Sequence, residues 1–551
     1  GTFTVMNDVD ASDTVNWNGR LGFDPIRGFY GKLDGQGNTV SGLTIERPDE
    51  DYVGLFGDTN RAPDNWTVPV IQNLNLASAA VSGRDYVGTL VGAGYGTDIR
   101  NINLSDVDVN GRNSVGGLIG LSSDKANYYL NGFGRWIEHA QTPGLVSYSS
   151  VSGNVMGTGE FIGGLVGRTA NAGSTSLMLN SISYSSSSAT VTGNNAVGGL
   201  LGNLNSVNLY GQGVSNCYAD GYVYGNSNFG GLVGQNIQSG ITGITDSYTP
   251  NIYNALDLQL MKYDLDGTFT VMNDVDASDT VNWNGEKGFE PINNFKGTFN
   301  GGGHTIDGIA INRPNDWCVG LFGYIDGATI SDVGISGGSI KGSQYVGALV
   351  GYSNATGLRS SSISRSFSTA SVEGIYSVGG LVGYAYRTSI SDSYVNAAVR
   401  GTQDVGGLVG YNDYYSTISN SYSAGSSYGI NSNNNNIGGL VGLNNHAAIS
   451  NSYSVALVSG SGNYGRLVGE NAYGTIRNSA ELDLHNGINA IGYDDATNGP
   501  RRYLYPDMGL DVISPWIFYS PRYLPTIYTS WNFDSIWSEE NGLPQLKWQT
   551  A

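Results

Sequence analysis

The chain has 551 residues, a formal net charge of −20 and a charged fraction of only 13%. An acidic chain repels nucleic acid and anionic membrane surfaces, so we expect neither as a partner. Its 83 glycines and 14 prolines fit neither collagen nor a proline-rich linker, and 39% hydrophobic content is too high for a disordered chain. The sequence shows no apolar run of the ~18 residues that a membrane-spanning helix needs.

The chain opens on a phrase that it later repeats. Residues 1–19, GTFTVMNDVDASDTVNWNG, return unchanged at 267–285, and the two copies stay aligned without a gap to Gly57 and Gly323. Only the second copy has a lead-in, residues 253–266, so we expect the chain to be a processed or trimmed part of a longer protein.

The repeated phrase also carries clustered aspartates. Their spacing resembles a calcium loop, but the closing glycine and the bidentate glutamate of an EF-hand are missing. The four histidines are far apart, and the two cysteines, Cys217 and Cys318, lack the spacing of a zinc site. We therefore expect no cofactor and no metal, with Ca²⁺ as the alternative. The aspartates are Asp8, Asp10, Asp13, Asp274, Asp276 and Asp279.

A shorter motif of the form VGGLVG recurs six times after the start of each duplicated phrase. Each interval contains three short segments that are rich in β-branched and aromatic residues and separated by Gly, Asn and Ser, which is typical of strands and turns. Three short strands in ~30 residues fit one coil of a parallel β-helix, whereas a propeller blade needs four strands in ~40 residues. The motif ends at Gly57, Gly92, Gly120, Gly167, Gly202, Gly234, Gly323, Gly351, Gly383, Gly410, Gly442 and Gly469.

This pattern predicts an all-β fold, a right-handed parallel β-helix of about twelve coils. We expect residues 1–252 to form the first half of the solenoid and residues 253–481 the second. Past Ser479 the repeat dissolves into a stretch with several Trp and Pro residues, so we expect residues 482–551 to form a C-terminal cap.

The VGGLVG segment, together with the phrase I-x-N-S-Y-S, resembles the GLUG-motif repeat family from Gly1 to about Ser479. Members of that family are secreted, adhesin-like surface proteins of bacteria and archaea. The resemblance implies an extracellular or cell-surface location and a partner that is a glycan, another cell-surface ligand or a second copy of the chain. It implies fold and location better than it implies chemistry.

The six places of I-x-N-S-Y-S can be read as columns down the stack. Small or aliphatic residues at the fourth place, including Ser147, Ser183, Cys217 and Ser421, predict an interior column. The third-place Asn predicts a bend with amides hydrogen-bonded from coil to coil. The fifth place should then face outward as an aromatic strip that binds sugar rings or, alternatively, as a structural tyrosine ladder. Its aromatic members are Tyr148, Tyr184, Tyr218, Tyr248, Phe367, Tyr394, Tyr422 and Tyr453.

The longest interval holds an insertion, residues 122–144, that concentrates aromatic and titratable side chains. A loop that leaves a regular stack is a common place for function, although the insertion could equally be a lid that packs its own aromatic residues. Candidate binding residues here are Tyr128, Tyr129 and Trp136, and candidate catalytic residues are Arg135, Glu138 and His139.

The composition, the duplication and the resemblance together favour a non-catalytic extracellular protein, either adhesin-like or a structural subunit of a sheath or filament. The alternative is a secreted polysaccharide lyase or glycoside hydrolase, because β-helices often carry such enzymes.

Overall fold

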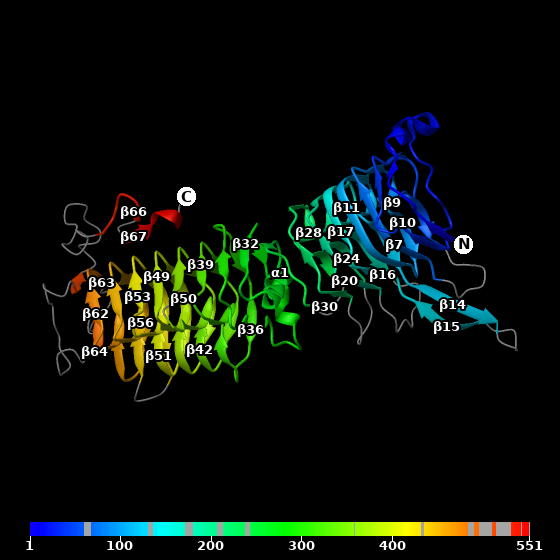
Figure 1. The fold of residues 1–551 in the computed structure, drawn as a ribbon. Coiled ribbons are helices and arrows are strands. Elements are labelled where there is room, and N and C mark those ends of the chain that lie inside the picture. Colours follow the sequence, from blue (N-terminus) through cyan, green and yellow to red (C-terminus); the bar gives the residue numbers. More distant parts are fainter. Residues whose placement is uncertain are drawn as a thin grey trace. The chain divides into compact units, whose positions relative to one another are not determined.

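The structure is a computed structural model that describes residues 1–59, 68–130, 136–170, 180–205, 213–236, 243–357, 359–430, 435–482, 490–494, 510–513, 531–540 and 543–549. Among these residues strands dominate, and the one α-helix is α1 (Ala255–Leu260). The chain divides into two compact units, Gly1–Tyr263 and Asp264–Ala551, each of which is a stack of parallel strands (Figure 1).

A single coil shows how the sequence produces the stack. The coil at Thr388–Asp413 contains four strands rather than the expected three, namely β49 (Thr388–Ser391), β50 (Tyr394–Gly401), β51 (Gln403–Gly406) and β52 (Val409–Asp413). Six of its side chains are aliphatic and fully buried. Each such side chain contributes roughly 1.5–3 kcal/mol, so the interior holds together strands that are too short to be stable alone. These residues are Ile390, Val395, Val399, Val405, Leu408 and Val409.

Successive coils pair in parallel and build four faces in the second unit. The strands of the first two faces, besides those already given, are β32 (Thr268–Val271), β34 (Thr298–Asn300), β39 (Thr329–Ser331), β44 (Ser361–Ser364), β53 (Thr417–Ser419), β57 (Ala448–Ser450) and β62 (Thr475–Arg477), then β33 (Val275–Asp276), β35 (Thr305–Asp307), β36 (Ala310–Asn312), β40 (Gly334–Ser336), β41 (Ser339–Lys341), β45 (Phe367–Ser368), β46 (Ser371–Glu373), β54 (Tyr422–Gly429), β58 (Tyr453–Ser454), β59 (Leu457–Ser459), β63 (Ser479–Leu482) and β65 (Leu510–Ile513).

The other two faces of the second unit come from the VGGLVG segments. One face holds β37 (Trp317–Val319), β42 (Gln344–Gly347), β47 (Tyr376–Gly379), β51, β55 (Asn436–Gly438) and β60 (Asn463–Gly465). The other, called here the β38–β64 sheet, holds β38 (Phe322–Ile325), β43 (Val350–Asn354), β48 (Val382–Tyr386), β52, β56 (Val441–Asn445), β61 (Val468–Ala472) and β64 (Ile491–Asp494).

The first unit repeats this plan. Its VGGLVG segments form one sheet of β6 (Phe56–Thr59), β10 (Val91–Tyr95), β13 (Ile119–Ser123), β19 (Val166–Ala170), β24 (Leu201–Leu204) and β29 (Val233–Asn236), and another of β9 (Asp85–Gly88), β12 (Asn113–Gly116), β18 (Glu160–Gly163), β23 (Asn195–Gly198) and β28 (Ser227–Gly230). A large sheet holds β1 (Thr2–Thr4), β2 (Val9–Asp10), β3 (Lys32–Asp34), β4 (Thr39–Ser41), β5 (Thr44–Glu46), β7 (Val70–Ala77), β8 (Ala80–Ser82), β11 (Asp98–Gly111), β16 (Leu145–Ser147), β17 (Ser150–Gly157), β20 (Ser181–Ser183), β21 (Ser186–Ser187), β22 (Thr190–Thr192), β25 (Val214–Ser215), β26 (Tyr218–Ala219), β27 (Val223–Tyr224) and β30 (Ile244–Thr245). The parallel β-helix is thus confirmed, with about 14 coils instead of about twelve.

The paired glycines of VGGLVG permit close stacking of the coils. A Cβ at Gly406 would overlap the carbonyl oxygen of Val409, and one at Gly407 would overlap the carbonyl oxygen of Gly439 on the next coil. Since neither position has room for a side chain, the repeated glycines serve the packing of the backbone.

The third place of I-x-N-S-Y-S is a bend, as the sequence predicts. Asn420 and Asn451 have φ of 49° and 48°, the left-handed region that Asn tolerates better than most residues. The bend resets the alternation of the strand, so that Ile418 before it and Ser421 after it are both fully buried. The amides also pair along the stack, since Asn101 Nδ2 donates to Asn73 Oδ1 at 2.8 Å.

The two copies of the opening phrase adopt the same structure. Ile26 pairs with Phe56 in the first unit, and Ile292 pairs with Phe322 in the second, at positions offset by 292 − 26 = 266 residues. Each phrase has two short strands followed by a 3-10 turn, at Ser12–Arg20 in the first copy and at Ser278–Asn282 in the second. The duplicated sequence is therefore a duplicated structural unit.

Helix α1 closes the last coil of the first unit. In other coils the amides of the GGLVG segment donate to carbonyl groups of the following coil, as Leu200 N does to Leu232 O at 3.0 Å. At the last coil the Asp257 carboxylate replaces those carbonyls, accepting from Gly231 N at 2.8 Å and from Leu232 N at 3.2 Å. Burial raises the pKa of Asp257 to about 6 despite these donors.

Two hairpins leave the regular stacks. The insertion in the first unit forms an antiparallel hairpin of β14 (Lys125–Leu130) and β15 (Trp136–Thr142), which extends from the side of the stack (Figure 1). In the second unit β66 (Trp537–Glu540) pairs with β67 (Leu543–Leu546) and is followed by a 3-10 turn at Lys547–Gln549.

Candidate functional site

The fifth-place aromatic residues of the second unit form a continuous ladder. Phe367, Tyr394, Tyr422 and Tyr453 lie opposite one another on successive coils. Their rings are nearly parallel, with centroid distances of 4.9 Å, 5.1 Å and 4.9 Å. This geometry follows from the parallel coil spacing, which places identical columns at the stacking distance of aromatic rings.

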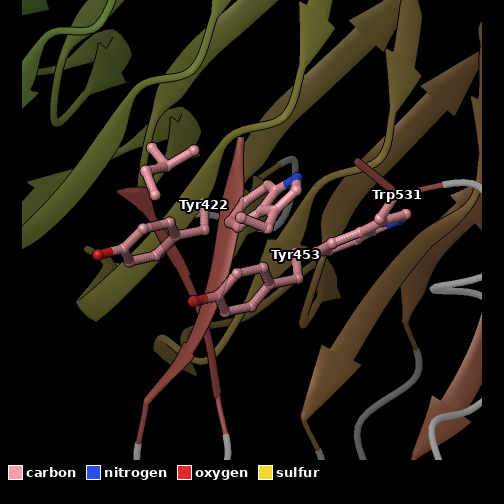
Figure 2. Packing of buried hydrophobic residues seen from close by; sticks show 5 residues of the cluster. Tyr422, Tyr453 and Trp531 are labelled. Atoms are coloured by element: carbon pink, nitrogen blue, oxygen red, sulfur yellow. The ribbon is translucent and has the colours of Figure 1, made fainter. Parts of the chain in front are cut away.

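The C-terminal residues cover this ladder. Trp531, Trp537 and Leu546 form a buried cluster with Tyr422 and Tyr453, which are only 8% and 2% exposed (Figure 2). Residues 531–540 and 543–549, which belong to the stretch expected to form a C-terminal cap, therefore pack on the flank of the stack, and the bounds of the cap stay a prediction.

Specific hydrogen bonds fasten the same segment to the flank. Tyr453 OH donates to Pro544 O at 2.5 Å, and Gln549 Nε2 donates to Tyr422 OH at 2.8 Å. Trp548 Nε1 donates to the carbonyl oxygen of Asp392 at 2.9 Å. The expectation that Tyr394, Tyr422 and Tyr453 form an open binding strip is therefore corrected for Tyr422 and Tyr453, because an external ligand cannot reach buried rings.

In the first unit Tyr148 and Tyr184 lie in a different column from the one predicted. Asn103 pairs with Ser150, so Ser149 and Ser185 occupy the interior fourth place that was predicted for Ser147 and Ser183. Tyr148 and Tyr184 instead stand at the bend, with φ of 50° and 48°. A shift of two residues arose because the phrases LVSYSS and SISYSS offer two alignments to I-x-N-S-Y-S.

The two tyrosines at the bend are exposed. Tyr148 is 62% exposed and Tyr184 is 54% exposed, and their rings stack at 4.9 Å and 4°. The aromatic residues at the fifth place in the first unit are Tyr218 and Tyr248, whose rings meet edge to face at 5.1 Å. A binding role for Tyr148, Tyr184 and Tyr218 stays a prediction.

The insertion carries the remaining predicted residues. The strand pairing places Tyr128 opposite Glu138 and Tyr129 opposite Ile137 in the β14–β15 hairpin. Arg135 lies outside the described residues, as do the side chains of Tyr128, Tyr129, Trp136, Glu138 and His139. Both the binding and the catalytic predictions for this hairpin stay predictions.

A second tyrosine column lies on the β38–β64 sheet, outside the columns predicted from the phrase I-x-N-S-Y-S. Tyr324, Tyr352, Tyr384 and Tyr411 lie opposite one another and are half-buried. Their successive centroid distances are 5.4 Å, 4.9 Å and 4.9 Å. We call these four residues the tyrosine face. Tyr345 lies against it, 5.0 Å from the Tyr352 ring.

A polar network borders the tyrosine face. Tyr384 OH donates to Asp413 Oδ2, and Asn445 Nδ2 donates to Tyr411 OH at 3.1 Å and to Asp413 Oδ1 at 2.9 Å. Burial raises the pKa of Tyr352 and of Tyr411 to about 12, and burial together with the Asp413 bond raises the pKa of Tyr384 further. These phenols are therefore neutral hydrogen-bonding groups at physiological pH.

At the edge of the same sheet one residue of each coil adopts a left-handed turn and projects outward. We call the residues at this edge the corner cluster, which consists of Arg387, Tyr414, Tyr415, His446 and Tyr473. The His446 ring stacks on Tyr414 at 4.4 Å and lies 5.0 Å from the Tyr473 ring. Tyr415 and Tyr473 are 73% and 62% exposed, which offers flat aromatic surface to solvent.

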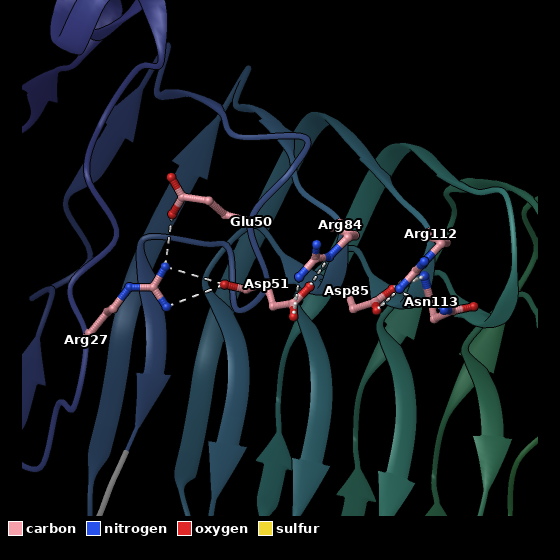
Figure 3. Close-up of polar contacts among 7 residues, drawn as sticks. All are labelled: Arg27, Glu50, Asp51, Arg84, Asp85, Arg112 and Asn113. Carbon is pink, nitrogen blue, oxygen red and sulfur yellow. Dashed lines mark hydrogen bonds and ion pairs between the residues drawn. The ribbon is translucent and has the colours of Figure 1, made fainter.

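Ion pairs neutralise the arginines on one edge of the first unit. Arg84 Nε donates to Asp51 Oδ1 at 2.7 Å, and Arg112 Nε donates to Asp85 Oδ1 at 2.9 Å (Figure 3). Hydrogen bonds from Arg84 and Arg112 lower the pKa of Asp51 and Asp85 respectively. This ladder joins neighbouring coils and leaves its charges paired.

The aspartates of the opening phrase accept hydrogen bonds from backbone amides. Asp8 Oδ1 accepts from Thr39 N at 2.8 Å, and Asp10 Oδ1 accepts from Ser12 N at 2.9 Å. Asp274 and Asp276 repeat these contacts with Thr305 N and Ser278 N. Within the described residues no three His, Cys, Asp or Glu side chains gather as a metal site would require. Calcium binding stays an untested alternative.

The cysteines behave as small buried side chains. Cys217 is buried in the interior column and Cys318 is half-buried, and both are free thiols. Burial raises the pKa of each thiol to about 11, which suppresses the reactive thiolate.

Comparison with known proteins identifies the repeat. Residues 374–400 and 401–427 match the family model described as the GLUG motif. These residues are GLUG-motif repeats. They span two coils, including β50 and β54, so each motif corresponds to about one turn of the solenoid.

Two further similarities are partial. The chain is similar to halomucin of Haloquadratum walsbyi (strain DSM 16790 / HBSQ001), with 43% identity over 93 residues, which are 16% of this chain and 1% of halomucin. A solved structure from Bacteroides ovatus, assigned as an immunoglobulin A1 protease, superposes with a TM-score of 0.40 and 20% identity, covering 54% of this chain and 92% of that one. Within the described residues, no helix is long and apolar enough to cross a membrane.

Proposed function

We propose that this GLUG-repeat chain is part of a non-catalytic, adhesin-like extracellular protein that binds glycans along the tyrosine face. The observation that carries the proposal is the alignment of Tyr324, Tyr352, Tyr384 and Tyr411 on four successive coils, with rings about one coil step apart. A solenoid holds such a column rigid, so a ligand does not have to order it on binding.

The chemistry of the tyrosine face suits sugars. An aromatic ring offers an apolar surface to the C–H face of a sugar, and a phenol hydroxyl at its end can hydrogen-bond to sugar hydroxyls. The network of Asp413 and Asn445 at the border holds the hydroxyl groups of Tyr384 and Tyr411 in place. Because these contacts are short-range, binding of a neutral glycan should persist at high salt.

The location rests on the repeat. GLUG motifs at 374–427 and the similarity to halomucin support an extracellular or cell-surface protein. The match covers 1% of halomucin, so the adhesin-like role is a proposal for this chain alone.

The test is binding of the full chain to a panel of neutral oligosaccharides by calorimetry. Replacing Tyr352 and Tyr411 by Ala should weaken binding about tenfold per ring, since an aromatic contact contributes roughly 1–1.5 kcal/mol. Tyr428→Ala is the matched control, because Tyr428 is exposed on β54, a different face. Equal affinity of the tyrosine-face variant and the parent for every bound glycan would contradict the proposal.

The non-catalytic part has its own test. The same panel, extended to plant, algal and microbial polysaccharides, should release no reducing ends and no unsaturated products. Turnover that Glu138→Gln abolishes would instead establish the polysaccharide-degrading alternative.

A further inference from the structure

The corner cluster places basic side chains among exposed aromatic rings. Arg387, Tyr415, His446 and Tyr473 have φ between 50° and 62°, so each turns its side chain outward at the same edge of the stack. The chain as a whole carries a formal charge of −20, yet this edge presents a guanidinium and an imidazole among exposed tyrosine rings.

Arg387 is held in a way that leaves its charge available. Its guanidinium carbon lies 5.6 Å from the centroid of Tyr386 and 5.6 Å from the centroid of Tyr415. Nη1 donates to the carbonyl oxygen of Gly357, and no described carboxylate forms an ion pair with the group. Two aromatic rings therefore fix the orientation of the guanidinium without neutralising it.

Two other arginines of the same unit, Arg365 and Arg313, form ion pairs with carboxylates instead. The Arg365 guanidinium donates to both carboxylate oxygens of Asp332, at 2.5 Å and 2.7 Å, and Arg313 pairs with Asp316 at 3.3 Å. The carboxylate nearest to Arg387 in register is Asp413, which faces Tyr386 across the sheet. Its carboxylate oxygens accept hydrogen bonds from Tyr384 and Asn445, and it forms no ion pair with Arg387 among the described contacts.

The neighbouring coils extend the basic character of this edge. Arg359 is exposed and packs beside Gly327, where an added Cβ would lie 2.9 Å from the Arg359 Cδ. On the other side His446 donates or accepts one bond, between Nδ1 and Asn445 Oδ1 at 2.8 Å, and its ring is otherwise stacked between tyrosines. The edge thus combines flat aromatic rings with the guanidinium groups of Arg387 and Arg359.

We infer that the corner cluster binds acidic sugars, with the sugar carboxylate on Arg387 and the sugar ring against Tyr415. This inference rests on the proposed glycan-binding function and names its ligand class. A planar guanidinium matches a carboxylate with two parallel hydrogen bonds, which gives orientation as well as affinity. The exposed tyrosines favour a sugar over an acidic peptide, because a peptide carboxylate would not need the adjoining flat rings.

The experiment uses matched pairs of ligands. Tetrasaccharides of galacturonic, mannuronic and glucuronic acid are compared with their carboxyl-reduced counterparts, which keep the stereochemistry and lose the charge. Calorimetry with the full chain at low salt should show at least one acid binding about tenfold more tightly than its reduced form. At 0.5 M salt the preference should shrink, since an exposed ion pair is screened within ~3–5 Å.

Variants separate the two proposals. Arg387→Gln should abolish the preference for the acid over the reduced sugar, whereas Arg400→Gln, which removes an equal charge from the exposed face of β50, should keep the preference. A thermal melt of each variant confirms folding. If the reduced sugars bind and depend on the tyrosine face but no acid is preferred, only this inference is overturned. If no sugar binds in either form, both proposals are overturned.

Discussion

The two units share one scaffold and differ in the side chains that the scaffold presents. In the second unit the residue after the closing glycine of the VGGLVG motif is tyrosine on the first four coils, Tyr324, Tyr352, Tyr384 and Tyr411, and Leu443 and Glu470 on the next two. In the first unit the same column reads Asp58, Ala93, Leu121, Arg168, Asn203 and Gln235.

The interiors show no such difference. Val and Leu of the VGGLVG segments are fully buried in both units, for example Leu165 and Val166 in the first and Leu408 and Val409 in the second. The backbone therefore depends on the inward columns, which must fill the core at constant volume, while the outward columns are free to carry a binding surface in one unit and not in the other.

The largest expected effect tests the claim that the interior is shared. Cys217 in the first unit and Ser421 in the second occupy the same interior column and are buried. Replacing either by Asp should lower the free energy of unfolding by about 3–5 kcal/mol, because the charge is buried without a partner.

Chemical denaturation measures both variants, and Thr417→Asp, on the exposed side of β53, serves as the control with little expected loss. A large loss for one of the two buried positions and none for the other would show that the units do not share an interior column.

Much of this architecture was readable in the sequence. The glycine spacing and the recurrence of I-x-N-S-Y-S predicted the parallel solenoid, the bend at Asn and the burial of Ser421, because a coil must repeat its inward pattern to stack. The tyrosine face could also have been predicted, since each of its tyrosines directly follows the closing glycine of a VGGLVG motif. That column lies outside the phrase I-x-N-S-Y-S, from which the other columns were predicted.

Other features could not be predicted from local pattern. Tyr148 and Tyr184 fit two registers equally well, and only the pairing of Asn103 with Ser150 decides between them. The burial of Tyr453 depends on Trp531 and on Pro544. Pro544, which accepts the hydrogen bond from Tyr453, lies 544 − 453 = 91 residues further along the chain. Long-range contacts of this kind leave no periodic signal in the sequence.

The second largest expected effect is a difference in stability between substitutions of two tyrosines, Tyr394 and Tyr148, that occur in similar sequence motifs. Tyr394 stacks between Phe367 and Tyr422 and lies 5.7 Å from the Trp548 ring, so Tyr394→Asn should cost about 2–4 kcal/mol. Tyr148→Asn should change stability by less than about 1 kcal/mol, because the lost stacking on Tyr184 is offset by the preference of Asn for a left-handed bend. Urea unfolding measures the free energy of unfolding of the two variants. Equal losses would indicate that Tyr148 occupies the fifth-place column rather than the bend.

The smallest effect concerns one buried carboxyl in each unit. Burial raises the pKa of Asp257 in the first unit and of Asp404 in the second to about 6, from an ordinary value of 3.8. Between these two pH values the folded state binds more protons than the unfolded state, so each group lowers stability as the pH rises from about 4 to about 6. Asp404→Asn should remove its share of this pH dependence and raise the free energy of unfolding at pH 7 by about 1–3 kcal/mol.

The same substitution at Asp257 should have the opposite sign. Asp404 Oδ1 accepts from Asn436 Nδ2 at 2.8 Å, a bond that the Oδ1 atom of an introduced amide can keep. Asp257 accepts from Gly231 N and Tyr253 N with Oδ2 and from Leu232 N with Oδ1, so an amide would turn its NH₂ group toward backbone donors. Asp257→Asn should therefore cost about 1–3 kcal/mol at pH 7, because buried N–H groups lose their acceptor. Urea titrations at pH 4 and pH 7 measure both variants. If Asp257→Asn instead stabilises the protein, the cost of burying the carboxylate exceeds the contribution of the hydrogen bonds that it accepts from the last coil. Helix α1 would then be held on the first unit by apolar packing alone.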